Sequence, residues 1–73
     1  MINLSYAKKI KVALAYKELT EAELARLMRT SPSALNQRMK TDKFTIEDLQ
    51  KIANKLGGAF IPGSFEFPDG TKI

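Results

Sequence analysis

Residues 20–39 read TEAELARLMRTSPSALNQRM and contain two helix-start signals separated by a short polar turn. At the first, Thr20 is followed three residues later by Glu23, which is the pattern of a capping box. At the second, Ser31 precedes Pro32, and proline suits the first helical position because its φ is already helical and it has no amide to satisfy. The stretch therefore predicts two short helices joined by a tight connection.

Apolar residues recur at helical spacing in both predicted helices. In the second helix, Leu35 and Met39 are four residues apart and can share one buried face. Leu19 and Leu24 flank Thr20 as a hydrophobic staple requires. The full set expected to face the core is Leu24, Ala25, Leu27, Met28, Leu35 and Met39.

Two further helices are predicted on either side of this stretch. Ser5 is a candidate cap for the earlier one, with Tyr6, Ile10, Ala13 and Leu14 on its buried side. Thr45 with Asp48 repeats the capping box for the later one, and Gly57 ends it. Helices of about ten residues are not stable alone, so the helices must pack together. The inward set of the last helix is Ile46, Leu49, Ile52, Ala53 and Leu56.

The hydrophobic period changes after Gly58, and this divides the chain into a helical domain, residues 1–58, and a C-terminal extension, residues 59–73. Phe65 and Phe67 alternate with Glu66, and a turn signal at residues 68–70 predicts a β-hairpin with residues 71–73. Residues 59–61 form a further candidate strand. Because a lone hairpin is marginal in water, Phe65 and Phe67 either cover the helices or contact a second copy as a homodimer.

The composition argues against an enzyme and against a metal or cofactor site. Among the 73 residues there is neither Cys nor His, which removes the commonest metal ligands and the commonest general base. No phosphate-binding glycine loop, catalytic residue or small-molecule pocket can be identified. No apolar run is long enough to span a membrane and no signal peptide opens the chain, so a cytoplasmic location is expected.

The net charge of +4 is unevenly distributed. The cations are concentrated in the first two-thirds of the chain, and this part can bind a polyanion such as nucleic acid. Residues 26–43 contain one acid, Asp42, against the cations Arg26, Arg29, Arg38, Lys40 and Lys43.

Polar residues form a stripe on the helix predicted from Pro32. At about 100° per residue, Ser33, Asn36, Gln37 and Lys40 share one side of this helix. Every surface helix has a solvated face, so the stripe alone does not distinguish solvation from recognition. A generic exposed face usually carries Glu and Lys, however, and residues 30–40 contain no acid.

The motif in residues 20–39 resembles the helix-turn-helix of the lambda-repressor-like family, also called the Cro-type or xenobiotic-response-element (XRE) family. The resemblance covers roughly residues 6–57 and implies a mainly α, compact four-helix domain, here with a short C-terminal β-hairpin. It also implies that a recognition helix, about residues 32–40, enters the major groove of DNA. The residues that match in type and spacing are Thr20, Glu23, Leu24, Ala25, Met28, Ser31 and Leu35.

Two departures from the family pattern have physical consequences. Arg29 stands where the family often has a glycine in left-handed conformation, at a cost of about 1–2 kcal/mol unless the turn is built differently. Leu14 and Met39 stand where many members bury an ion pair. Since both partners are apolar together, the resemblance predicts that Leu14 contacts Met39.

The resemblance also assigns contacts to DNA. It places base contacts on Pro32, Ser33 and Gln37, with Asn36 beside them, and amide side chains can bond adenine in a bidentate way. Glu21 opposes this assignment. It stands where relatives often have an amide side chain that contacts a DNA phosphate, and a carboxylate there would repel the DNA backbone. The expected phosphate contacts are Ser31, Arg38, Lys40 and Lys43.

The sequence thus predicts sequence-specific binding of double-stranded DNA, as expected of a transcriptional regulator. The alternative is a protein-interaction module that has the same fold but does not bind DNA. It stays open because fold does not imply function. Glu21, Arg29 and the hairpin favour this alternative.

Overall fold

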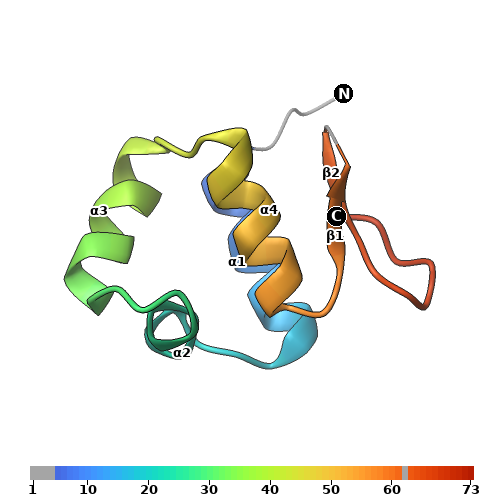
Figure 1. The fold of residues 1–73 in the computed structure, drawn as a ribbon, viewed down its shortest axis with the longest axis horizontal. Helices are drawn as coiled ribbons and strands as arrows, with labels where there is room; N and C mark the ends of the chain where they lie inside the picture. The colour runs from blue at the N-terminus through green and yellow to red at the C-terminus, as the bar shows by residue number, and fades with distance from the viewer. Residues whose placement is uncertain (1–4, 62) are drawn as a thin grey trace.

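The computed structural model describes residues 5–61 and 63–73 and shows a compact, mainly helical fold with a short C-terminal hairpin (Figure 1). Within these ranges, no helix is long and apolar enough to cross a membrane. The elements are α1 (Tyr6–Lys17), α2 (Glu21–Leu27), α3 (Pro32–Thr41), α4 (Ile46–Lys55), β1 (Ala59–Ile61) and β2 (Ser64–Glu66).

All four helices begin where the sequence predicts. The side chains of Ser5, Thr20, Ser31 and Thr45 each accept a hydrogen bond from the backbone amide three residues on, at 3.1–3.2 Å. Both capping boxes are closed, because Glu23 and Asp48 accept the amides of Thr20 and Thr45 in return. These caps are local in sequence, which explains why the helix starts can be predicted without tertiary information.

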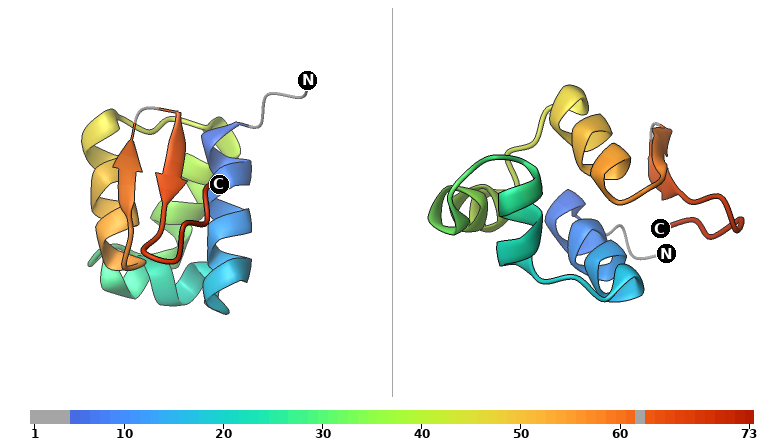
Figure 2. Two further views of the ribbon diagram at one scale, coloured as in Figure 1. Left: turned by 90° about the vertical axis from the view of Figure 1, so that its right-hand side faces the viewer. Right: turned by 60° about the horizontal axis from the view of Figure 1, so that its bottom comes forward.

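α1 and α4 occupy the middle of the molecule, between the hairpin and the α2–α3 pair (Figure 1), and the hairpin lies across both of them (Figure 2). The hairpin covers one side of α1 and α4, where β1 contacts α4 and β2 contacts α1. α2 and α3 contact each other on the other side, and α3 lies farthest from the hairpin (Figure 1). The exposed face of α3 and the hairpin are therefore at opposite ends of the molecule.

One hydrophobic core joins all the elements. Ile10, Leu24 and Leu49 are completely buried, and α3 contributes Leu35 and Met39. The core cluster consists of Ala7, Ile10, Ala13, Leu14, Leu24, Ala25, Leu35, Met39, Leu49, Ile52, Ala53, Leu56, Phe60, Phe65 and Phe67. Leu14 and Met39 are thus members of the same cluster, and α1 contacts α3, as the predicted contact between them requires.

Two residues expected in the core are not buried. Leu27 is 40% exposed, because Leu24 and Met28 share the inward face of α2 and Leu27 falls beside it. Ile46 is 49% exposed, because it is the first residue of α4 and lies at the end of the inward stripe. Met28 is half-buried and packs against the core cluster.

The C-terminal extension contains the further candidate strand as β1, and its pairing with β2 was not predicted. β1 and β2 are antiparallel with Phe60 opposite Phe65; Pro62, in the connection between them, lies outside the described residues. On the other edge of β2, the backbones of Phe65 and Ile73 exchange two hydrogen bonds of 2.7 and 2.8 Å. Phe65 is 0% exposed and Phe67 is 5% exposed. The extension therefore packs on its own domain, and these two side chains are already buried in their own chain.

Three non-glycine residues follow helix ends in left-handed conformation: Glu18, Arg29 and Asp42. At Asp42 the cost of the left-handed conformation is offset, because its carboxylate accepts a hydrogen bond from the backbone amide of Ala7 at 2.8 Å. Arg29 has φ 56°, so the turn between α2 and α3 keeps the left-handed geometry of the family pattern. The turn is therefore not rebuilt to avoid this conformation, and the cost of the non-glycine residue is retained.

We expect Arg29→Gly to stabilise the fold by about 0.5–1 kcal/mol, because relief of the left-handed backbone outweighs the added entropy of the unfolded chain. Urea denaturation measures this difference. Arg26→Gly is the matched control, since Arg26 is exposed inside α2 and glycine there should destabilise by about 1 kcal/mol. Destabilisation by both variants would contradict a strained turn at Arg29.

Candidate nucleic-acid interface

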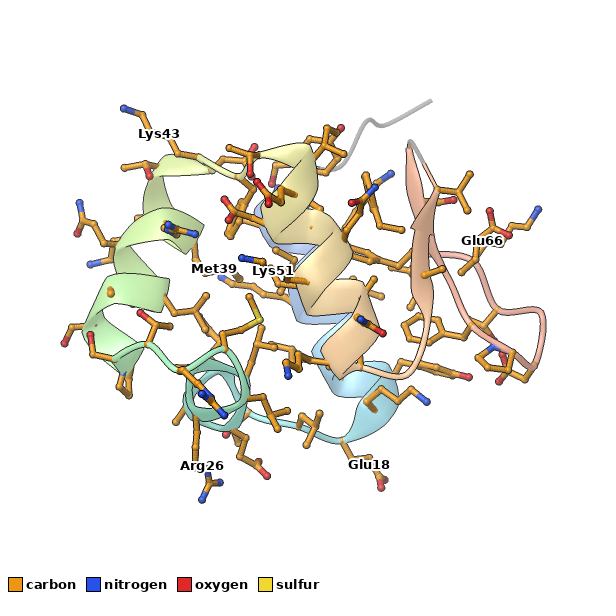
Figure 3. The ribbon with its side chains drawn as sticks, viewed as in Figure 1. Glu18, Arg26, Met39, Lys43, Lys51 and Glu66 are labelled. Carbon is orange, nitrogen blue, oxygen red and sulfur yellow. The ribbon has the colours of Figure 1, made fainter. Side chains whose placement is uncertain are left out.

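α3 separates its polar and apolar residues as the sequence predicts. Ser33, Asn36 and Gln37 are exposed, whereas Leu35 and Met39 retain only 4% and 6% of their exposure. Figure 3 shows Met39 on the side of α3 that faces α4. The two apolar anchors therefore hold α3 against the core, and its polar stripe is presented outward.

The four candidate base-contacting residues are brought together at one open hollow on the surface. Pro32, Ser33, Asn36 and Gln37 line it from α3, and Glu21 lines it from the start of α2. The position of Glu21 follows from the capping box, which fixes where α2 begins, and from the close contact between α2 and α3. Its place beside Asn36 and Gln37 was not predicted, since spacing along the chain does not show which side chains meet across two helices.

Glu21 contains an unsatisfied buried atom. Its Oε1 has less than 1 Å² of accessible surface and no hydrogen-bond partner among the described residues. A buried acceptor without a donor typically costs about 1–3 kcal/mol, and more when the group is charged. Such atoms are uncommon in folded proteins. Because its accessible surface is so small, this acceptor can be reached only after the Glu21 side chain or a neighbouring side chain rearranges.

The four candidate phosphate contacts differ in their surroundings. The Ser31 hydroxyl already accepts the amide of Ala34 at 3.1 Å as the cap of α3. Lys40 and Lys43 are exposed and form no ion pair with the described residues, and Lys43 extends away from the end of α3 (Figure 3). These two lysines are the free cations at the carboxyl end of α3.

Arg38 is directed toward α4 and away from the polar stripe. Its Nη1 lies 3.2 Å from Oδ2 of Asp48. Desolvation raises the pKa of Asp48, but hydrogen bonds from Thr45 and the charge of Arg38 outweigh it, so the pKa lies below its ordinary value. Asp48 therefore stays ionised at neutral pH, and Arg38 must leave this pair to reach a phosphate.

Two of the other surface hollows include residues of α4. One, of about 210 Å³, is lined by apolar side chains together with Thr30, Arg38, Asp48 and Lys51. The other is basic and gathers Arg29, Lys51 and Lys55, with Leu27, Met28 and Asn54 completing its lining. Lys51 extends from α4 toward α3 (Figure 3). The sequence signal for the second hollow is the spacing of Lys51 and Lys55, which places both on one face of α4, but it does not identify Arg29 as their neighbour.

The far side of the molecule is closed by contacts within the chain. The Tyr16 ring lies 4.9 Å from that of Phe67, and the Tyr16 hydroxyl donates to the carboxylate of Asp69. This bond, with the amide of Thr71, lowers the pKa of Asp69 to about 2, and the same carboxylate raises the pKa of Tyr16. A dimer contact through Phe67 would have to displace this packing.

Comparison with known proteins finds no matching family model, no matching curated protein and no matching solved structure. Within residues 5–61 and 63–73, no group of acidic side chains is arranged to hold a metal ion.

Proposed function

We propose that this chain is a lambda-repressor-like helix-turn-helix protein that binds double-stranded DNA sequence-specifically and acts as a transcriptional regulator. In this proposal α3 enters the major groove and α2 lies across its amino end. The observation that carries it is the gathering of Ser33, Asn36 and Gln37 on the exposed face of a helix whose opposite face is anchored by Leu35 and Met39.

The packing of α2 against α3 supports this arrangement. Ala25 is completely buried, and the two helices contact each other directly. A small side chain permits such a close approach, which presents the outer face of α3 as a ridge free of neighbouring elements (Figure 1). An α-helix of this kind fits the width of the major groove.

The charges around α3 include, among the described residues, two free lysines and one paired arginine. Lys40 and Lys43 supply unpaired positive charge at one end of α3, where phosphates can be met. Arg38 is available only at the expense of its pair with Asp48. Since few cations flank the stripe, we expect modest affinity and a correspondingly shallow salt dependence.

The second candidate function is a protein-interaction module on the same scaffold. Glu21 favours it, because a carboxylate beside the polar stripe opposes the approach of phosphates. A protein partner could satisfy Glu21 with a lysine or arginine side chain. The two functions predict opposite results for substitutions on α3 when DNA is the ligand.

We expect Gln37→Ala to weaken binding to the preferred duplex by about 1–3 kcal/mol and to relax selection at one base position. Lys43→Ala should instead weaken binding to all duplexes alike and reduce the salt dependence. Both effects can be measured by fluorescence anisotropy with labelled duplexes.

Gln50→Ala is the matched control, because Gln50 is an exposed glutamine on α4. It should leave every affinity unchanged. If Gln37→Ala and Gln50→Ala bind all duplexes as tightly as the original chain, α3 does not read DNA and the interaction module becomes the better account.

A further inference from the structure

Glu21, which lines the hollow on α3, has one acceptor that the fold leaves without a donor. The unsatisfied atom is Oε1 of Glu21, and the residues that share its hollow are Pro32, Ser33, Asn36 and Gln37. A carboxylate only accepts hydrogen bonds, and Pro32 has no backbone amide. The donors carried by the residues of this hollow are the backbone amide and hydroxyl of Ser33 and the side-chain amides of Asn36 and Gln37, and Lys11 shares a second hollow with Glu21.

We infer that Glu21 makes the α3 surface select bases that carry an amino group in the major groove, adenine or cytosine, over the keto bases guanine and thymine. This inference rests on the proposed DNA-binding function and deepens it. Adenine presents N6 and cytosine presents N4 as donors, whereas guanine O6 and thymine O4 are acceptors.

Direct contact requires the Glu21 side chain to turn outward, because Oε1 has less than 1 Å² of accessible surface, and the contact then gives this preference in one step. A donor from a base edge satisfies Oε1 of Glu21 when the base enters the hollow, and a charge-assisted hydrogen bond of this type is stronger than a neutral one. A keto oxygen at the same place would face the carboxylate with no proton between them. The unsatisfied acceptor would then remain buried beneath the DNA as well.

A relayed contact gives the same preference. When the NH₂ of Gln37 or Asn36 turns to donate to Glu21, the carbonyl oxygen of that amide faces away from the carboxylate and toward the base. An outward carbonyl is an acceptor, so it also requires an amino group on the base. Both routes therefore present an acceptor to the major groove. The preference for amino bases over keto bases is the same whichever route forms.

The alternative location for Glu21 is beside a phosphate of the DNA backbone. There its negative charge would repel every duplex equally, because phosphates carry no sequence information. The two locations therefore differ in a measurable way. Neutralising Glu21 changes base preference in the first case and changes affinity without changing preference in the second.

The test is selection from a duplex library with a randomised core, followed by competition binding at physiological salt with the selected duplex and its variants at each position. The original chain should prefer adenine or cytosine at one position by about tenfold over guanine or thymine. Glu21→Gln should reduce this preference to about twofold, because an amide can both donate and accept.

Glu47→Gln is the matched control, since Glu47 is an exposed acid in the first turn of α4 and carries the same charge. It should keep the tenfold preference, and thermal melting should show all three proteins folded. If Glu21→Gln binds every duplex more tightly but keeps the original base preference, Glu21 faces a phosphate and the inference is overturned. If none of the three proteins binds any duplex, the proposed function fails, and the inference fails with it.

Discussion

Replacing Phe65 by alanine is expected to destabilise the fold by about 3–5 kcal/mol, the range for removing a buried aromatic ring. Phe65 is 0% exposed, its ring lies 5.3 Å from that of Phe60, and its backbone is bonded to Ile73. A domain of this size has a stability of only about 5 kcal/mol, so the variant should keep about 2 kcal/mol or less and unfold at a much lower urea concentration. Circular dichroism during urea denaturation measures the loss.

Ile61→Ala is the control for this prediction, because Ile61 lies in the same hairpin but is 50% exposed. It should change the free energy of unfolding by about 0.5 kcal/mol or less. The account of the hairpin as part of the core would be contradicted if the two variants had equal stability. It would also be contradicted if Phe65→Ala remained folded and only changed its molecular mass in solution, since that result would place Phe65 at a contact between copies.

The second large effect is expected at Gly58, where an added methyl group has no space. A Cβ built on Gly58 would lie 2.5 Å from the backbone oxygen of Glu66 and 2.8 Å from Cδ1 of Phe67. Because a backbone atom cannot move aside cheaply, Gly58→Ala should cost about 1–3 kcal/mol and separate the hairpin from the end of α4. Thermal denaturation measures this cost.

Gly63→Ala separates the steric effect from the conformational one. Gly63 has φ +101° but open space around it, so alanine there should cost about 1 kcal/mol through backbone strain alone. A smaller loss at Gly58 than at Gly63 would show that the hairpin does not pack against Gly58 as described.

The helices could be predicted from the sequence because their determinants are local. Ser5, Thr20, Ser31 and Thr45 cap helices through side chains that reach only three residues along the chain. The exposure of Ile46 could not be predicted in the same way, because periodicity gives the direction of a side chain but not whether another element covers it. The extra strand pairing of the hairpin likewise depends on contacts between segments.

The candidate site was predictable in part. The exposed stripe of Ser33, Asn36 and Gln37 follows from helical spacing, and the structure confirms their exposure. The pairing of Arg38 with Asp48 and the position of Glu21 in the hollow depend on how helices cross, which a single sequence does not specify. The resemblance to a helix-turn-helix family stays a proposal that rests on the motif and on the presentation of α3.

The central claim is that the outer face of α3 meets DNA, and an amide chemical-shift titration with a generic duplex tests it most directly. The account predicts that shifts concentrate on residues 31–43 at low salt, weaken at physiological salt, and spare the hairpin at the opposite end of the molecule. An absence of shifts at low salt, or shifts confined to residues 59–73, would contradict it.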